Sequence, residues 1–258
     1  MKEFDHVSKS KLLMLFRCDQ QWVFRYPMDL IRRPNGSMTF GSAWHDGAGF
    51  DFHQKVQSGK NLPAKESVEY AVTSLEARRE DTDWEDEKFS DAKASLVALQ
   101  TEYANDLAQE VQPIEGGVEQ ETRIELESGV RVLGYIDVVT AEGSIDLKST
   151  KRKWPEGDGQ KKIEPFLYTL DEPGDSVFGF HVGIRKKKPE VQEVIVKVAA
   201  KTKIAARGLI DRCAVRMREL IADPERALPS GFGSWACTKR QCGYHRECTK
   251  RWGLPIPD

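Results

Sequence analysis

Apolar residues recur at helical spacing along much of the first half of the chain. Four stretches follow this period: residues 10–26, 40–57, 68–78 and 87–107. In the first of them, Ser8 or Ser10 is a suitable N-cap and Pro27 ends the pattern, so Cys18 is expected to lie on a helix. The amino-terminal part of the protein is therefore predicted to be mainly helical.

The period then changes to the two-residue alternation of strands. Residues 119–127, 130–140 and 144–150 alternate in this way, with the turn signals Ser128-Gly129 and Glu142-Gly143 between them. A helix at 163–170, strands at 176–184 and 191–198 and a helix at 201–222 are expected to follow. Helices before and after a group of strands indicate an α/β or α+β layered domain. We expect the α/β form, a mixed central β-sheet flanked by helices.

The length of 258 residues and the 39% hydrophobic content suit one globular domain. Its expected parts are a mainly helical segment (1–115), the sheet with the active site (116–200), a helix (201–228) and a cysteine-rich tail (229–258). The tail has too little regular pattern to pack unaided. No apolar stretch approaches the roughly 20 residues of a membrane span, and the first ten residues lack the apolar core of a signal peptide. We therefore expect a soluble, cytoplasmic protein.

A net charge of −2 does not mark the whole chain as a nucleic-acid-binding protein, so any such surface must be a local patch. Acidic residues crowd positions 76–91, whereas 148–162 and 185–188 are basic. A run of like charges is as often a solvated face as a binding surface.

Two carboxylates and a lysine are predicted to meet on adjacent strands. Asp137 ends the motif GYID, and Asp146 and Lys148 lie two residues apart in the next strand, on one face of it. Such an oxygen-rich site suits Mg²⁺ or Mn²⁺, and the lysine can orient a water or stabilise developing charge during phosphodiester hydrolysis. The alternative is an ordinary surface hairpin with a cross-strand Asp–Lys pair.

The surrounding motifs resemble those of the PD-(D/E)xK nuclease superfamily, in its RecB-like exonuclease branch. The resemblance covers nearly the whole chain, through LLMLFRCDQQWVFRYP, TFGSAWHDG, GYIDVV, IDLKST, EPFLY and the cysteine-bearing tail. It implies a restriction-endonuclease-like core in which His45, Asp137, Asp146 and the backbone carbonyl of Leu147 bind the metal ion. Lys148 would be the catalytic lysine.

The helix after the lysine strand departs from the family pattern. Relatives often carry a Q-x-x-x-Y motif there, whereas this chain has Glu164 and Tyr168 at the same spacing. The i, i+4 spacing keeps both side chains on one helix face, and Pro165 places the helix start near Glu164. We expect both residues in the active site, with Glu164 contacting metal or water rather than DNA.

Four of the five cysteines are candidates for a second metal site. Cys237, Cys242 and Cys248 lie close together in the tail and need a fourth ligand, for which Cys18 and, for zinc, His245 are the choices. Cys213 lies in a helical pattern and is expected in the core. In cluster-bearing RecB-like nucleases, such as the AddB type and its CRISPR-associated relative, one cysteine precedes the core and three follow it. That resemblance implies a [4Fe-4S] cluster on Cys18, Cys237, Cys242 and Cys248, with Zn²⁺ as the alternative.

Candidate DNA contacts lie in the basic runs that follow two of the strands. They are Lys151, Arg152, Lys153, Trp154, Arg185 and Lys186. The cations would hold phosphates and Trp154 would stack on a base, unless the loops are merely solvated and Trp154 is a core residue.

The function we expect is a metal-dependent DNA exonuclease acting on single-stranded or frayed ends in recombination, repair or phage DNA processing. DNA is the expected partner, with a helicase, a recombinase or another replication protein, because the sequence has no helicase-type phosphate-binding loop. Two other classes stay open: a DNA-binding or partner-docking module with little or no cleavage, and a redox or zinc-binding regulator that uses the cysteines alone.

Overall fold

The computed structural model describes residues 4–85, 87–231, 234, 236–239 and 241–253. The chain divides into two compact units. The sheet unit comprises Arg33–Thr122 and Tyr135–Lys203, and the cysteine unit comprises Met1–Arg32, Arg123–Gly134 and Ile204–Asp258. Each unit is assembled from segments that are far apart in the sequence, whereas the predicted parts followed the chain in order. The prediction of a single domain stays a prediction.

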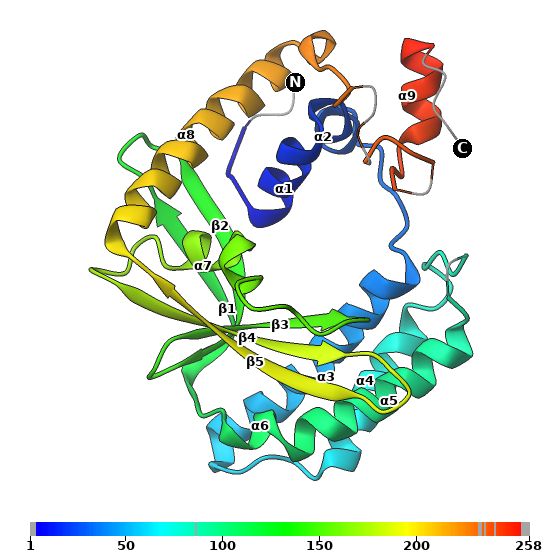
Figure 1. Ribbon diagram of the computed structural model, residues 1–258, viewed down its shortest axis with the longest axis vertical. Coiled ribbons are helices and arrows are strands. Elements are labelled where there is room, and N and C mark those ends of the chain that lie inside the picture. Colours follow the sequence, from blue (N-terminus) through cyan, green and yellow to red (C-terminus); the bar gives the residue numbers. More distant parts are fainter. Residues whose placement is uncertain (1–3, 86, 232–233, 235, 240, 254–258) are drawn as a thin grey trace. The chain divides into compact units, whose positions relative to one another are not determined.

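A mixed sheet of five strands, in the order β1-β2-β3-β4-β5, confirms the predicted α/β class (Figure 1). The strands are β1 (Pro113–Glu125), β2 (Arg131–Thr140), β3 (Ser144–Thr150), β4 (Ser176–Ile184) and β5 (Glu190–Val198). β3 is antiparallel to β2 and parallel to β4, and β4 is antiparallel to β5. β3 and β4 have the predicted bounds, and β1 and β2 each run from one unit into the other.

The helices of the sheet unit are α3 (Gly36–Ser58), α4 (Ala64–Ala77), α5 (Phe89–Asn105), α6 (Leu107–Glu110) and α7 (Glu164–Tyr168), and a 3₁₀ turn, Gly159–Lys161, precedes α7. α3 begins earlier than predicted because the side chain of Asn35 caps it, accepting a hydrogen bond from the Met38 N–H at 2.9 Å. Its first turn is not apolar, so the hydrophobic period alone could not reveal it.

Strand alternation gives the sheet two different faces. Leu147 is paired with His181, and the preceding pair is Asp146 with Phe180, so these two pairs lie on opposite faces. On the Leu147 face, α5 approaches β4 so closely that a Cβ at Gly183 would lie 2.8 Å from Leu99. On the Phe180 face lie α7 and the loop that follows β3. The apolar helical layer therefore leaves the Asp146 face for chemistry.

The cysteine unit corrects the prediction for Cys18. In place of one helix over residues 10–26 there are two, α1 (Lys9–Arg17) and α2 (Asp19–Arg25), and Cys18 separates them with an extended backbone (φ −172°, ψ 122°). Cys18 therefore does not lie on a helix. The apolar period continues across the break, so a one-residue interruption leaves no trace in the pattern. Ser8 is the N-cap, accepting from the Lys11 N–H.

The carboxyl-terminal tail is more regular than predicted. After α8 (Ala200–Ala222) and a 3₁₀ turn, Pro224–Arg226, the tail contains α9 (His245–Trp252), which ends at Gly253 with φ 61°. Cys242, Tyr244 and Cys248 pack with Phe24 of α2. The predicted tail also includes residues 232–233, 235, 240 and 254–258, which lie outside the described residues. Among the helices that the structure describes, none has the length and apolarity of a membrane span.

Arg185 is a buried structural residue, which corrects its assignment as a DNA contact. Its side chain is 5% exposed and forms an ion pair with Glu87. Its guanidinium carbon lies 3.6 Å from the ring centroid of Phe40 on α3. The backbone N–H of Arg185 donates to the carbonyl of Thr150 at 2.7 Å. An enclosed and already paired guanidinium is not presented to a phosphate.

Replacing Arg185 with methionine should lower the free energy of unfolding by about 3 kcal/mol, because the half-buried Glu87 carboxylate would lose its partner. Lys186→Met is the matched control, since Lys186 forms an exposed pair with Glu190 and should cost less than about 1 kcal/mol. Urea unfolding followed by circular dichroism measures both. Equal, small losses would show that the pair is not structural.

His181 should make stability depend on pH. Burial lowers its pKa from 6.5 to about 4, so below about pH 6.5 the unfolded chain takes up a proton that the folded chain refuses, and stability falls until about pH 4. Between about pH 6.5 and about pH 5 the wild type should lose about 2 kcal/mol more than His181→Gln. Glutamine keeps a hydrogen-bonding group for Tyr103, whose hydroxyl lies 2.9 Å from His181 Nδ1. Parallel urea titrations with equal losses in the two proteins would contradict this.

Candidate active site

Asp137 is held where β2 and β3 separate. The two strands pair through Val138 with Ile145 and Val139 with Ser144. Beyond that point the N–H of Leu147 donates to Oδ2 of Asp137 at 2.6 Å. The carboxylate thus takes a backbone donor at the mouth of the opening between the strands.

Lys148 joins two buried carboxylates. Its ammonium pairs with Asp146 of the same strand and lies 3.0 Å from Oε1 of Glu164, the first residue of α7. Asp146 is 2% exposed and Glu164 is 4% exposed. A buried carboxylate is stable as an anion only when it is paired, so this single ammonium stabilises both charges.

His45 enters the site from α3. Its Nδ1 lies 3.1 Å from Oδ1 of Asp137, and because a carboxylate only accepts, the ring nitrogen donates. Burial by itself would lower the pKa of His45, but the Asp137 carboxylate outweighs burial and raises it. The same pair lowers the pKa of Asp137 against the effect of its own burial. The preceding residue, Trp44, is fully buried and packs edge-on against Tyr103, which fixes this turn of α3.

Tyr168 completes the group on the far end of α7. It is 4% exposed and its ring lies 6.2 Å from that of Phe178. Burial, and after it the Asp146 carboxylate, raises the pKa of its hydroxyl well above the ordinary value, while Lys148 acts in the opposite direction. All six side chains predicted to be catalytic therefore lie in the sheet unit and influence one another.

Phe180 is a site residue that the sequence reasoning missed. Lys148 Nζ lies 5.8 Å above its ring, and the ring of Trp154 packs against it at 5.2 Å. Phe180 is paired with Asp146 in the parallel register of β3 and β4, so its ring lies on the same face of the sheet as Asp146 and Lys148. The alternation of Phe178 and Phe180 with glycine on β4 was the available signal.

The donor set fits a divalent cation, although it is not already arranged around one. No three His, Cys, Asp or Glu side chains in the described part of the chain form a ready set of metal ligands. In the sheet unit, Lys148 occupies Asp146 and Glu164, and His45 and the Leu147 N–H occupy Asp137. Three carboxylates against one lysine nevertheless leave an excess of negative charge, and carboxylates with an imidazole suit Mn²⁺ or Mg²⁺.

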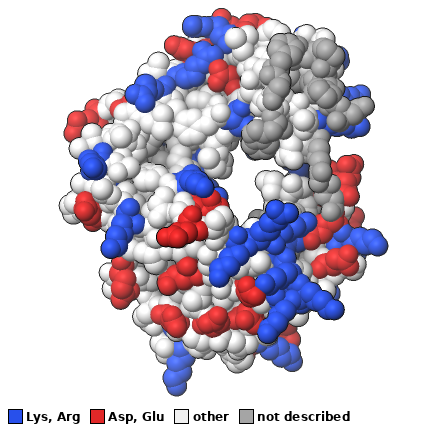
Figure 2. All heavy atoms as spheres, in the orientation of Figure 1, with Lys and Arg blue, Asp and Glu red and all other residues white. Residues whose placement is uncertain are grey.

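The two basic runs come together at the ends of β3 and β4. Lys151, Arg152 and Lys153 are exposed, as is Lys186. The pKa of Glu190 is lowered chiefly by a hydrogen bond from Lys186, and Lys153 and Lys188 also contribute. Lysines from both runs therefore surround one glutamate. In Figure 2, Lys and Arg side chains gather where Figure 1 places the connection between β4 and β5.

Trp154 is half-buried, so it is neither a fully buried core residue nor a fully exposed base-stacking residue. Its backbone N–H donates to Gln192 at 3.0 Å and its carbonyl accepts from the same side chain at 3.1 Å. Lys162 Nζ lies 4.4 Å from its ring centroid. The indole is thus fixed in place with part of its surface accessible.

The four candidate cluster cysteines belong to the cysteine unit and influence one another's pKa, although no three of the described side chains form a ready set of metal ligands. Burial, and after it the thiols of Cys18, Cys242 and Cys237, raises the pKa of Cys248 to about 11. The pKa of Cys237 is raised by burial and then by Cys18 and Cys242. Gln21 donates to Sγ of Cys242 at 3.0 Å. Crowded, largely buried thiols suit a soft metal centre, which would stabilise their thiolate forms.

The fifth cysteine, Cys213, and the possible zinc ligand His245 have different surroundings. Cys213 is 6% exposed on α8, and burial raises its pKa, as expected for a core cysteine. Nε2 of His245 is enclosed and has no hydrogen-bond partner among the described residues. A histidine nitrogen of this kind keeps zinc open as the alternative metal.

Comparison with known proteins shows a likeness of fold. A solved structure from Eubacterium rectale, described as a "putative exonuclease", matches with a TM-score of 0.57 at 12% sequence identity. The match covers 98% of this chain and 90% of that one. No protein-family model and no curated protein matches the sequence. At this identity the likeness extends to the fold alone, a mixed sheet with flanking helices.

Proposed function

We propose that this chain is a metal-dependent deoxyribonuclease of the PD-(D/E)xK superfamily, RecB-like branch. The observation that carries the proposal is the meeting of Asp137, Asp146, Lys148 and His45 at the point where β2 and β3 separate. Two carboxylates, an ammonium and an imidazole from three elements are more than a cross-strand surface pair requires. The fold shared with the Eubacterium rectale protein agrees with a nuclease.

Asp137, Asp146, His45 and the carbonyl of Leu147 would hold the cation. When bound, it would supply Lewis acidity toward a phosphoryl oxygen and a water molecule. Hydrolysis forms a bond from the water oxygen to phosphorus and breaks one phosphorus–oxygen ester bond, with a proton passing to the departing oxygen. Lys148 would orient the water and stabilise the charge that develops on the phosphoryl oxygens.

Glu164 would keep Lys148 in position when a cation takes over Asp146. The Lys148 ammonium contacts both carboxylates. If a metal ion binds Asp146, Glu164 therefore remains as the partner of Lys148. A glutamine at this position, as in the family motif, would hold the ammonium less strongly because it carries no charge. The buried hydroxyl of Tyr168 would remain protonated and available as a donor.

DNA would lie along the joint basic surface beside the site. Lys151, Arg152, Lys153 and Lys186 would contact phosphates, and the accessible part of Trp154 would stack on a base. We propose exonuclease action on single-stranded or frayed ends in recombination, repair or phage DNA processing, with a helicase or recombinase as partner.

The cysteines would form a [4Fe-4S] cluster on Cys18, Cys237, Cys242 and Cys248. Its role would be structural, since it would close a loop of more than 200 residues and tie the tail to the first helices. Support comes from the mutual influence of the four thiols within one unit.

A second candidate function is DNA binding or partner docking with little cleavage. The observation that favours it is the absence, among the described residues, of a ready set of metal ligands, with Lys148 already paired with Asp146 and Glu164. The two functions differ in whether the wild type cleaves DNA when metal is supplied.

With Mn²⁺ or Mg²⁺, the wild type should degrade end-labelled single-stranded DNA, and a chelator should stop it. Asp146→Asn and Lys148→Met should each slow cleavage by about a hundredfold or more, because one removes a metal ligand and the other the stabilising ammonium. Asp171→Asn and Lys197→Met, at exposed positions of the same unit, are the matched controls and should cleave normally.

Two results of this assay would reject the mechanism: cleavage that needs no metal, or equal cleavage by site and control variants. A wild type that binds DNA but cleaves neither single nor double strands with any divalent metal would support the docking function instead.

Protein purified without oxygen should be brown, absorb visible blue light and contain iron and sulfide. Cys248→Ser should lose the colour and melt at a lower temperature, because a cluster ligand is gone. Cys213→Ala is the matched control and should keep its iron, whatever its stability. A colourless preparation that contains zinc alone would reject the cluster and favour a zinc site that includes His245.

A further inference from the structure

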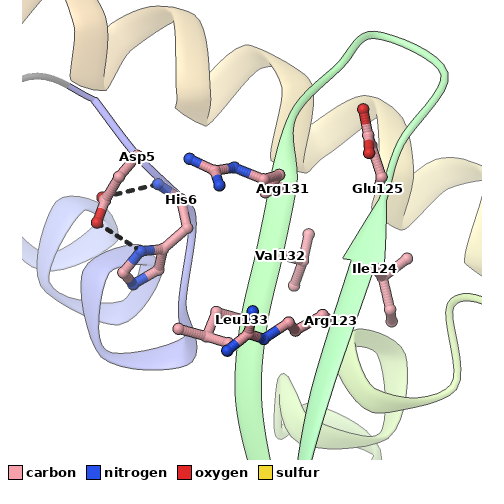
Figure 3. A pocket seen from close by; sticks show the side chains of 8 residues that line it. All are labelled: Asp5, His6, Arg123, Ile124, Glu125, Arg131, Val132 and Leu133. Carbon is pink, nitrogen blue, oxygen red and sulfur yellow. Dashed lines mark hydrogen bonds and ion pairs between the residues drawn. The ribbon is translucent and has the colours of Figure 1, made fainter.

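A cavity of about 420 Å³ lies in the cysteine unit, beside the segment that precedes α1. That segment extends the edge of β2, since the N–H of Val7 donates to the carbonyl of Arg131 at 2.8 Å and the N–H of Leu133 donates to Val7 at 2.9 Å. The cavity spans the segment and the hairpin of β1 and β2 (Figure 3). Val132 and Ile124 are buried and form its apolar part.

Two arginines supply positive charge to this cavity. Arg123 on β1 and Arg131 on β2 are exposed, and Figure 3 shows both side chains extending toward the amino-terminal segment. The guanidinium of Arg131 has no hydrogen bond or ion pair with any other residue that the structure describes. Guanidinium groups bind phosphate oxygens through paired N–H donors, so two of them in one cavity favour an anion.

His6 also lines this cavity, and Asp5 holds its imidazole ring in place. Its Nδ1 lies 2.9 Å from Oδ2 of Asp5, and its side chain is 24% exposed. The other oxygen of Asp5 accepts from the His6 N–H at 2.7 Å and from Lys11 at 2.9 Å. Asp5 is therefore occupied by His6 and Lys11, and Nε2 is the ring nitrogen of His6 that Asp5 does not contact.

The acidic side chains of the cavity do not cancel this charge. Burial raises the pKa of Asp5, but Lys11 and His6 together outweigh burial and lower this pKa to about 2. In Figure 3, the carboxylate of Glu125 lies across β2 from His6 and is directed away from it. The part of the cavity between His6 and the two arginines is thus cationic.

We propose that this cavity binds a phosphate group of a nucleic-acid strand, with Arg131 as its main ligand and with Arg123 and His6 contributing beside it. The identity of the strand rests on the proposed nuclease function, whereas the preference for phosphate rests on the cavity alone. The phosphate has two possible sources in a strand, an internal diester or a terminal monoester, and the experiment below distinguishes them.

The test measures binding of fluorescent oligothymidylate in chelator, where metal-dependent cleavage does not occur. Three probes are used, with a 5′-phosphate, with a 3′-phosphate and with hydroxyl ends. The double variant Arg123→Gln/Arg131→Gln should bind about tenfold more weakly, and the slope of log affinity against log salt should fall by about 1 to 2. The charge-matched control is the double variant Arg212→Gln/Arg218→Gln, which changes two exposed arginines of α8 in the same unit. It should lose less affinity than Arg123→Gln/Arg131→Gln.

Equal losses for all three probes would identify an internal diester, and a loss confined to one phosphorylated end would identify a terminal monoester. Both results support the site. An Arg123→Gln/Arg131→Gln protein that binds every probe as Arg212→Gln/Arg218→Gln does, with an unchanged circular dichroism spectrum, would overturn it. As a measurement independent of DNA, inorganic phosphate should raise the melting temperature of the wild type more than that of Arg131→Gln, and equal shifts would count against the site.

The outcomes also separate this inference from the proposed function. Loss of phosphate and DNA binding in the double variant of a protein that never cleaves would retain the site and reject the nuclease. Active cleavage by the protein, together with unchanged DNA binding in the double variant, would retain the nuclease and reject the phosphate site.

Discussion

The geometry of the candidate active site depends on one ammonium group that compensates two buried carboxylates. Asp146 and Glu164 are almost inaccessible to solvent, and both contact Lys148. Without that contact each buried carboxylate would lose a charged partner, at a large desolvation cost. Lys148 therefore fixes α7, which carries Glu164, against β3, which carries Asp146. The separation of β2 from β3 depends on a related contact, because Asp137 accepts the Leu147 N–H at that point.

The sheet makes this arrangement rigid by giving its two faces different tasks. Leu147 and Gly183 face a helical layer so close that a single added methyl group would strike Leu99. The residues that alternate with them, Asp146 and Phe180, face the charged groups. In the proposed hydrolysis, side chains carried by strands and by a helix held through an ion pair would orient a phosphate once a cation takes the place of Lys148 at Asp146.

The sequence predicted those features that follow from alternation or from a local motif. β3 and β4 have the expected bounds, and the predicted catalytic side chains lie in one unit because hairpin geometry and the i, i+4 spacing of α7 determine their faces. The unpredicted features depend on contacts between segments far apart in the chain. The break at Cys18 lies inside an unbroken apolar period, and α9 forms in a stretch whose partner, Phe24, is more than 200 residues away. Arg185 stands in a basic run, and its burial results from Glu87 and Phe40.

The two proposed metal sites use donors of opposite softness, and this difference explains how one chain could hold both. Carboxylates, a carbonyl and an imidazole bind hard or borderline cations such as Mg²⁺ and Mn²⁺, whereas thiolates bind zinc and iron–sulfur clusters more tightly. All four candidate thiols belong to the cysteine unit, and all the candidate oxygen ligands belong to the sheet unit. An ion that suits one set is therefore a weak competitor for the other. The cysteines can then act on stability while the carboxylates act on chemistry, without either set compromising the other.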